Sequence, residues 1–383
     1  MISKPLRLHR AATELLFGIM SQPIQNGGSP ALCSALCAAI AVLSVGSRST
    51  FAQDLLLVPD SLGDKVWAFS AVDGSVVNPN FIPPDSHLSQ PIKIVVSPAG
   101  TLLITDEVAN AIFEYSGSGS YIRTIVDSYQ GIDRPYGIEV VGEWIYFSMS
   151  ITQGSVTTGV LKRVRIDGTG LEDWCVLPQI VSPRDIVHIG GGDFLVGDSG
   201  THPGGEDIER IGPGCSLASE PWHNSDGISG IDFPQQITLP GDGTALAAGF
   251  SDPYGLFVYD LQLGLEMARV STVLASPRGV HLMKDGRYFY TGGTRVTIWD
   301  PVAEVNIPIV NQLSPNGSFR FVTAVSITPD CPTDLDSDGV TGGSDLAVLL
   351  GAWASLGGDV NGDGTTDGID LAALLGAWGA SCQ

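Results

Sequence analysis

The chain has 383 residues, of which 43% are hydrophobic, and it carries a formal net charge of −22 at pH 7. A surface this acidic repels nucleic acid and anionic lipid, so neither is expected as a partner. Its 48 glycines and 24 prolines argue for many turns and against a mainly helical fold.

Residues 1–52 are expected to be a secretory signal peptide. Three basic residues stand in the first ten positions, an apolar run covers 31–45, and small residues precede a cleavage point after Ala52. The apolar run is short for a membrane span, although an uncleaved N-terminal anchor is the alternative. We therefore expect a secreted or cell-surface protein with no membrane span in the mature chain, which would carry a net charge of −25.

Residues 53–329 repeat a short phrase in which a proline opens an apolar strand. The phrase occurs at Pro91, Pro135, Pro183, Pro234 and Pro277, with spacings of 44, 48, 51 and 43 residues. Two or three further short apolar runs with period-2 alternation follow each phrase. Repeats of this length, each with about four strands, predict an all-β propeller.

The two ends of this region are predicted to share one blade. Residues 54–82 begin at the second strand of a repeat, whereas 318–328 supply a first strand and nothing more. Joining them closes the ring and leaves no open sheet edge. Five complete repeats and one composite give six blades; seven is the alternative if the long stretch 183–233 contains another.

The phrasing resembles NHL-type and related six-bladed propellers. The best matches are Pro135-Tyr-Gly137-Ile138 and the run from Thr105-Asp106 through Asn110 to Tyr115. The resemblance implies the fold more than an activity. Gluconolactonase-like relatives hold a catalytic metal with Glu, Asp and Asn at the channel mouth. Here only Asp185 and Glu139 stand near that place, too few for a metal site.

Basic residues gather at the points where the chain enters each blade. These residues are Lys93, Arg134, Arg184, Arg278 and Arg320. Converging guanidinium groups in an anionic protein favour a small anionic ligand or an acidic saccharide at the propeller channel. The alternative is structural: each arginine bonds the neighbouring blade or pairs with an acid such as Asp185.

Four cysteines remain after the leader, an even number that suggests disulfides in an exported chain. Three pairings are open. The most economical pairs Cys175 with Cys215 in the propeller and Cys331 with Cys382 around the C-terminal region.

Residues 331–383 contain two copies of an acidic loop followed by an apolar helix, and matching residues of the two copies are 25 positions apart. Oxygen ligands at loop positions 1, 3, 5, 7 and 12, usually with one at position 9 that acts through water, and glycine at position 6 are what Ca²⁺ requires. The predicted ligands are Asp334, Asp336, Asp338, Val340 and Asp345 in the first loop, and Asp359, Asn361, Asp363, Thr365, Asp367 and Asp370 in the second. Two calcium ions are therefore expected.

An apolar stripe is predicted along each of the two helices. The residues are Leu346, Leu349, Leu350 and Trp353, then Leu371, Leu374, Leu375 and Trp378. The spacing i, i+3, i+4, i+7 places each set on one helix face. We expect the two stripes to pack against each other, and we expect bound calcium and a Cys331–Cys382 disulfide to stabilise this small core further.

This C-terminal region resembles the dockerin family of duplicated calcium modules, with the motif D-x-[DN]-x-D-G-x5-D-L in both copies. The resemblance implies folding on calcium and docking to a cohesin-like domain. In the family the partner contacts cluster at loop positions 10 and 11. Gly343-Ser344 and Gly368-Ile369 depart from the usual Ser/Thr there.

The sequence thus predicts a secreted binding propeller attached through a calcium-dependent module. The alternative is an extracellular hydrolase, either lactonase-like or polysaccharide-degrading, anchored in the same way. No catalytic motif was found, so catalytic residues are not assigned and enzyme activity is left open. A third interpretation is a structural unit of a cell-surface assembly.

Overall fold

The computed structural model describes residues 53–200, 207–217, 222–225, 230–274, 276–311, 317–327, 333–336, 340–355, 358–360 and 365–380. The leader 1–52 lies outside these residues. No helix within the described ranges has the length and apolar character needed to cross a membrane.

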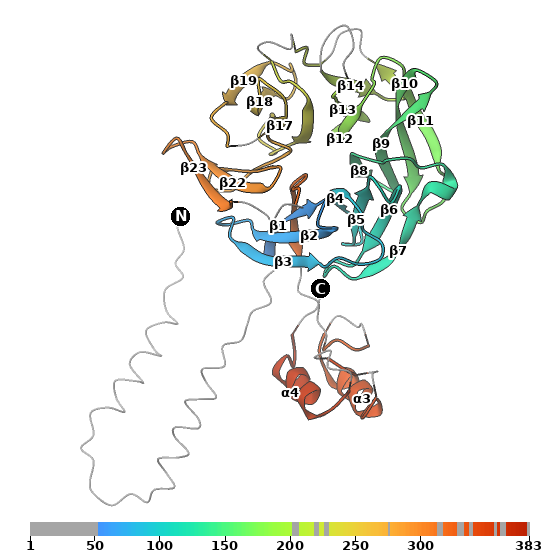
Figure 1. Ribbon diagram of the computed structural model, residues 1–383. Coiled ribbons are helices and arrows are strands. Elements are labelled where there is room, and N and C mark those ends of the chain that lie inside the picture. The colour runs from blue at the N-terminus through green and yellow to red at the C-terminus, as the bar shows by residue number, and fades with distance from the viewer. Residues whose placement is uncertain are drawn as a thin grey trace, which may run out of the picture. The chain divides into compact units, whose positions relative to one another are not determined.

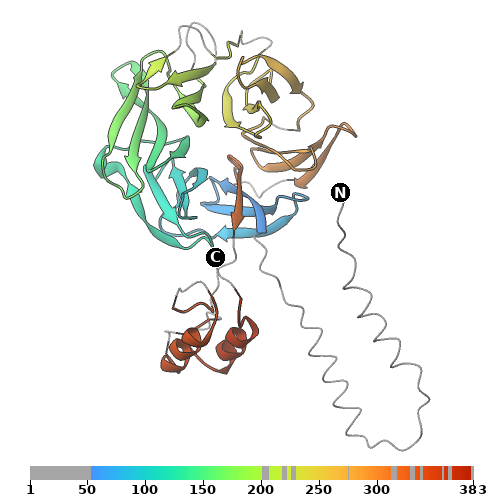
Figure 2. The ribbon, with the colours of Figure 1, turned by 180° about the vertical axis from the view of Figure 1, so that it is seen from behind.

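Six four-stranded antiparallel sheets stand around a common centre, as Figure 1 shows from one side and Figure 2 from behind. The prediction of an all-β, six-bladed propeller is confirmed. Blade 2 consists of β4 (Pro91–Val96), β5 (Leu102–Asp106), β6 (Ala111–Tyr115) and β7 (Tyr121–Val126). Blade 3 consists of β8 (Ile138–Val141), β9 (Trp144–Gln153), β10 (Val156–Arg165) and β11 (Glu172–Leu177), after the one-turn helix η1 (Ser128–Gln130).

The remaining blades follow in chain order. Blade 4 consists of β12 (Pro183–Gly190), β13 (Asp193–Asp198), β14 (Ile208–Gly212) and β15 (Ser216–Leu217). Blade 5 consists of β16 (Pro234–Thr238), β17 (Thr244–Gly249), β18 (Gly255–Asp260) and β19 (Glu266–Val270). Blade 6 consists of β20 (Gly279–Leu282), β21 (Tyr288–Gly292), β22 (Arg295–Asp300) and β23 (Val305–Val310). The stretch 183–233 forms one blade and its connection, rather than two blades.

Blade 1 joins the two ends of the propeller region. Strand β24 (Thr323–Ile327) pairs with β1 (Gln53–Asp60), which is followed by β2 (Lys65–Ser70) and β3 (Val76–Ile82). The closing strand begins five residues later than residue 318, the expected start. Before it, Phe319 makes single bridges to both Asp60 and Gly293, so this segment links blade 1 to blade 6. The sheet hydrogen bonds therefore tie the two ends of the propeller region together and close the ring.

Carboxylates at the ends of second strands fix the entry to the inner strands. Asp106 ends β5 and accepts hydrogen bonds from the backbone N–H groups of Ser89 and Gln90. Asp60 and Asp198 hold the equivalent segments of blades 1 and 4 in the same way. These contacts explain why the second strand of several repeats ends in Asp: the carboxylate satisfies amides that the sheet leaves unpaired.

One disulfide links neighbouring blades. Cys175 on β11 and Cys215, in the turn before β15, are bonded with their Cα atoms 5.2 Å apart. This is the pairing expected for these two cysteines. Cys331 and Cys382 lie outside the described residues.

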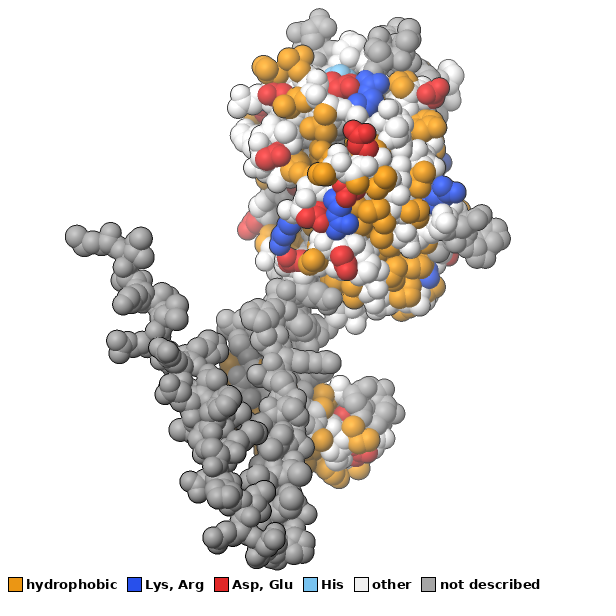
Figure 3. Space-filling model, turned by 90° about the vertical axis from the view of Figure 1, so that its left-hand side faces the viewer, with side chains coloured by type: hydrophobic (Ala, Val, Ile, Leu, Met, Phe, Trp, Pro, Cys, Tyr) orange, Lys and Arg blue, Asp and Glu red, His pale blue; other side chains and the backbone are white. Residues whose placement is uncertain are grey.

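The C-terminal region contains two short helices, α3 (Gly343–Gly351) and α4 (Gly368–Gly376). The expected burial of whole stripes was wrong in part, because only Leu349 and Leu374 are fully buried. Trp353 and Trp378 are 47% and 50% exposed, respectively, and Figure 3 shows apolar side chains on this module's surface. Each helix ends before its tryptophan, and its buried residues are the aspartate at loop position 12 and the leucine four residues later.

Candidate functional site

Three inner strands of the propeller have a β-bulge directly after the proline. In blades 2, 4 and 5 the register with the second strand skips between Pro91 and Ile94, between Pro183 and Ile186, and between Pro234 and Ile237. A bulge re-aims side chains that a regular strand would direct to the sheet faces. In each blade, two residues follow the proline of the phrase, or Phe319 in blade 1. The first of them belongs to one layer around the propeller axis, and the second belongs to another.

The first of these we call the mouth layer. It contains, in blade order from blade 1, Arg320, Ile92, Tyr136, Arg184, Gln235 and Arg278. The second, which we call the brace layer, contains Phe321, Lys93, Gly137, Asp185, Gln236 and Gly279.

Tyr136 fills the centre of the mouth layer. Its hydroxyl donates to Gln235 in blade 5 at 3.2 Å and accepts from the Nη1 of Arg320 in blade 1 at 3.3 Å. Tyr136 itself belongs to blade 3, so both contacts cross the axis. Its ring packs edge-on against Phe321, and the two residues form a small apolar cluster with Ile92. At this level packed side chains fill the axis.

Two arginines of the mouth layer are anchored around this tyrosine. The guanidinium of Arg184 lies 4.6 Å from the ring centre of Tyr136 and 5.2 Å from that of Phe233. Arg320 donates through its Nε to the hydroxyl of Ser61 at 2.7 Å. A stacked guanidinium is held in one plane while its N–H edge stays available, which suits bidentate recognition of an anion.

Arg278 completes a group of three. Its guanidinium lies over the ring of Phe250 at 4.5 Å, and its buried Nε has no hydrogen-bond partner among the described residues. The pKa of Arg278 is lowered to about 10, first by burial and then by the neighbouring Arg320 and Arg184. Within the described chain, none of the three arginines forms an ion pair with a carboxylate. The mouth therefore carries uncompensated positive charge in an acidic protein.

The other two predicted cations are engaged elsewhere. Arg134 pairs with Glu107, and its backbone N–H donates to Asn110, the left-handed turn residue of blade 2. Lys93 lies in the brace layer and pairs with Asp185, the acid suggested as a partner for the arginines. The structure thus brings together three of the five expected ligand-binding residues.

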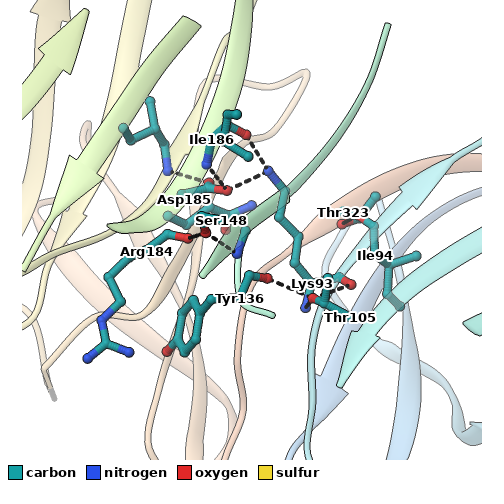
Figure 4. Close-up of polar contacts among 12 residues, drawn as sticks. Lys93, Ile94, Thr105, Tyr136, Ser148, Arg184, Asp185, Ile186 and Thr323 are labelled. Carbon is teal, nitrogen blue, oxygen red and sulfur yellow. Dashed lines mark hydrogen bonds and ion pairs between the residues drawn. The ribbon is translucent and has the colours of Figure 1, made fainter. Parts of the chain in front are cut away.

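The brace layer links blades that are not neighbours in the ring. The Nζ of Lys93, in blade 2, donates to Asp185 at 2.6 Å and to the carbonyl of Ile186 at 3.1 Å, both in blade 4 (Figure 4). The second oxygen of Asp185 accepts from the N–H of Ile237 in blade 5 at 2.9 Å. Since both side chains are almost fully buried, this ion pair is a structural contact between two blades rather than an exposed binding site.

A buried glutamine completes the network on the other side. The Oε1 of Gln236 accepts from the N–H groups of Val280 and Val322, and its Nε2 donates to the carbonyl of Val322 at 2.7 Å. Glycines leave the space in which groups from neighbouring blades come this close together. A Cβ at Gly279 would stand 3.0 Å from the Oε1 of Gln236, and one at Gly137 would stand 2.4 Å from the carbonyl oxygen of Arg184.

Glu139 lies near the brace layer on β8. Its pKa is raised to about 7, chiefly by burial and also by Asp185, while Lys93 opposes the shift. A carboxyl group that titrates near neutral pH beside a charged pair can accept or donate a proton. It is the one predicted channel acid with this property, because Asp185 is committed to Lys93.

The sequence reasoning did not find Tyr136 or Gln236. Both stand at the positions after the proline, like the arginines that were found. Aligning the five phrases on their prolines could therefore have identified both residues. They were missed because they are uncharged, whereas the predicted ligand-binding residues were chosen by their positive charge.

In the C-terminal region the first loop brings three predicted calcium ligands together. One carboxylate oxygen from each of Asp334, Asp336 and Asp345 lies within 4.8 Å of the others. Asp345 also accepts hydrogen bonds from the N–H groups of Leu335 at 2.7 Å and Gly342 at 2.6 Å. These bonds wrap the loop around one carboxylate, and an all-oxygen donor set is what a hard cation prefers.

The second loop repeats this arrangement where it is described. Asp370 accepts from the N–H groups of Val360 at 2.8 Å and Asp367 at 2.7 Å, and Asp367 caps α4 by accepting from Ile369. Asp359 and Thr365 are described, whereas Asp338, Asn361 and Asp363 lie outside the described residues. Val340, a predicted backbone ligand, is 44% exposed.

The two copies interlock through backbone hydrogen bonds. The N–H of Thr341 donates to the carbonyl of Ala380 at 3.0 Å, and that of Thr366 donates to Ser355 at 2.8 Å. Each pair differs from the other by 25 residues, so the module has an internal two-fold repeat. Because each loop holds the end of the other helix, the loops and helices form one unit.

No protein-family model matches the chain, and no curated protein matches its sequence. Solved structures do match its shape. A chain from the nidogen/laminin complex has 15% identity and a TM-score of 0.57, covering 72% of this chain and 99% of that one. A protein of unknown function from Bacteroides caccae has 13% identity and a TM-score of 0.53, covering 72% of this chain and 100% of that one. Similarity at this level establishes a shared fold alone.

Proposed function

We propose that this protein is a secreted binding protein. In this proposal the propeller takes an anionic ligand at its mouth layer, and the C-terminal module attaches the protein, in a calcium-dependent way, to a cohesin-like partner domain. Secretion is inferred from the leader. The similarity to a chain of the nidogen/laminin complex, which is a complex between proteins, is consistent with a binding role for such a propeller.

The observation that carries the proposal is the group formed by Arg184, Arg278 and Arg320. An unpaired cation is costly to hold here, because burial, and then the charges of Arg320 and Arg184, lower the pKa of Arg278. A bound anion would relieve this repulsion by accepting hydrogen bonds from the N–H edges of these guanidinium groups. Since Tyr136 and the brace layer fill the axis, the ligand would bind over the mouth rather than inside a channel.

The ligand class follows from the guanidinium edges. Carboxylate and sulfate groups both accept two parallel N–H bonds from one arginine. An acidic saccharide, such as one containing uronate units, offers several such groups at a spacing that can reach more than one arginine. A small polycarboxylate is the smaller member of the same class.

Titration with oligogalacturonate and with a sulfated oligosaccharide, followed by calorimetry, tests this part. In Arg184→Ala/Arg278→Ala the affinity should fall at least about 10-fold, because each charge-assisted hydrogen bond contributes about 1.5–3 kcal/mol. Arg287→Ala is the matched control, because that arginine pairs with Asp285 in the turn before β21. Binding that is unchanged in the double variant would remove the proposal for the mouth.

The calcium part of the proposal rests on the donor set and its preformed loops. The described oxygens of Asp334, Asp336 and Asp345 fit a Ca²⁺ ion, and the same positions recur in the second loop. Bound Ca²⁺ would neutralise the clustered carboxylates and stabilise two helices that each bury a single leucine.

Calorimetry of the full-length protein with CaCl₂ should give two binding events. Asp345→Ala and Asp370→Ala should each remove one of them. Binding to a cohesin domain, measured with CaCl₂ and then with EDTA, tests attachment separately. If CaCl₂ gives binding heat but no cohesin domain binds, the calcium sites are supported and the proposed partner is contradicted.

A second candidate is an extracellular hydrolase, which Glu139 favours. Its pKa of about 7 suits a general acid or base at neutral pH. Lactones and acidic polysaccharides are the substrates to assay. A turnover that Glu139→Gln abolishes would support this candidate, and the absence of turnover on both substrate classes would remove it.

A further inference from the structure

The side chains around Tyr136 present hydrogen-bond donors at the mouth of the propeller. The Nη atoms of Arg184 and Arg278 form no hydrogen bond within the described chain. Arg320 donates from its Nη1 to Tyr136, and its Nη2 forms no hydrogen bond with any described residue. In Figure 4 the guanidinium of Arg184 and the ring of Tyr136 extend to the same side, away from the ion pair of the brace layer. The mouth layer therefore has N–H groups available to a ligand.

Gln235 adds a different kind of donor at the same place. Its side chain is 1% exposed, and its Oε1 accepts from the hydroxyl of Tyr136. Because Arg320 donates to the same hydroxyl oxygen, the hydroxyl proton is directed at Gln235 and identifies Oε1 as the acceptor. The amide NH₂ of Gln235 forms no hydrogen bond within the part of the chain that the structure describes. An unpaired amide in a buried side chain is costly, so a ligand gains by supplying an acceptor to it.

The acceptors of the mouth layer are largely used by the fold itself. The backbone carbonyls of five of its six residues accept hydrogen bonds from other parts of the chain. These carbonyls belong to Ile92, Tyr136, Arg184, Arg278 and Arg320. Glu107 raises the pKa of Arg278, but by less than the neighbouring arginines lower it, and its carboxylate pairs with Arg134. A ligand group at the mouth therefore meets donors and few open acceptors.

A centre made of donors distinguishes anionic groups by their protons. Sulfate esters and carboxylates carry no proton near neutral pH, so all their oxygen atoms can accept hydrogen bonds. A phosphate monoester has a second pKa of about 6, and below that pH it carries an O–H group that needs an acceptor. Binding such a group where no acceptor is open should weaken affinity by about 5-fold to 100-fold.

We propose that Gln235 makes the mouth layer selective for anionic groups that carry no proton, so that its ligand is a sulfated or uronate-containing saccharide. The guanidinium edges of the three arginines hold the charge, and the amide NH₂ of Gln235 donates to an oxygen that a protonated phosphate would occupy with its O–H. A phosphate monoester is accepted only as its dianion. This inference rests on the proposed binding of an anion at the mouth.

Three galactose derivatives test the proposal at equal charge. At pH 5, galactose 6-sulfate, galacturonate and most of the galactose 6-phosphate each carry one negative charge, and only the phosphate group retains a proton. Ligand-observed NMR titration of the full-length protein should give a Kd at least about 5-fold lower for the sulfate and the uronate than for the phosphate. At pH 8 this disadvantage of the phosphate should disappear. The charges of Arg134, Glu107 and Asp133 act on all three ligands, so comparison at one pH removes their contribution.

Gln235→Glu replaces the amide NH₂ by an acceptor of nearly the same shape. Its negative charge should weaken every anion, and a dianion most, so charge alone would keep or increase the preference for sulfate over phosphate. An acceptor for the phosphate O–H has the opposite effect, and the preference at pH 5 should fall at least about 5-fold. Gln262→Glu, in the exposed turn between β18 and β19, is the matched control and should keep the wild-type preference. Far-UV circular dichroism establishes that each variant is folded.

The proposal is overturned if galactose 6-phosphate binds as tightly as galactose 6-sulfate at pH 5, or if Gln235→Glu keeps the wild-type preference. Anion binding at the mouth then stands, provided that Arg184→Ala/Arg278→Ala abolishes binding. If none of the three ligands binds, or if that double variant binds them as the wild type does, the proposed function fails and this inference fails with it. The wild-type comparison at pH 5 decides the matter even where Gln235→Glu does not fold.

Discussion

Replacing Lys93 by methionine should destabilise the propeller more than any comparable surface substitution. The lysine side chain is 7% exposed, Asp185 is 0% exposed, and their charged atoms are 2.6 Å apart. Methionine fills much of the same volume but leaves the carboxylate buried without its cation. Breaking a buried pair in this way costs about 3–5 kcal/mol. For a domain of this size the melting temperature should fall by about 6–20 °C.

The dependence on pH identifies the cause. Burial already raises the pKa of Asp185, while Lys93 and the amides of Ile237 and Ile186 oppose the shift. Without the lysine the pKa rises further, so the folded variant holds a proton that the unfolded chain releases. Its deficit relative to wild type should therefore be small near pH 4 and grow as the pH rises to 7.

Urea denaturation followed by near-UV circular dichroism, at several pH values, measures this deficit. Lys93→Met/Asp185→Asn should recover part of the loss, because asparagine keeps an acceptor for the backbone amides and carries no charge. A deficit below about 1 kcal/mol at pH 7 would refute the argument that the pair is a buried strut. So would a deficit of equal size at all pH values.

Three further predictions concern stability. Because the pKa of Glu139 rises from 4.5 to about 7 on folding, stability should fall as the pH rises through this window, and Glu139→Gln should remove about 3 kcal/mol of that dependence in pH-resolved urea titrations. Gly137→Ala places a Cβ against the carbonyl of Arg184 and should cost about 1–3 kcal/mol, whereas Gly376→Ala, which faces open space, should leave the propeller transition unchanged in calorimetry. Cys175→Ser/Cys215→Ser should lower stability by about 4 kcal/mol on the chain-entropy estimate, since the bond closes a loop with a sequence separation of 40; an unchanged urea midpoint would contradict it.

Much of the fold could be read from the sequence, because a propeller is a local repeat. The five proline phrases fix the blade period, and the partial repeats at 54–82 and 318–328 predict that the two ends share a blade. The second-strand aspartates, such as Asp106, were visible for the same reason, since each acts within its own repeat. The three arginines of the mouth layer could also be found, because equivalent positions in a closed ring meet at one place.

Only the tertiary structure decided what those positions do. Bulges after the prolines of blades 2 and 4 accompany the contact of Lys93 with Asp185, 92 positions away, and Tyr136 meets Arg320 from 184 positions away. A linear pattern contains no information about which blades face each other across the centre. The same holds for the C-terminal helices, which end before Trp353 and Trp378 and leave both side chains exposed. The repeat period in the sequence determined the number and bounds of the blades. The packing of side chains at the propeller axis determined which residues form the mouth layer and the brace layer.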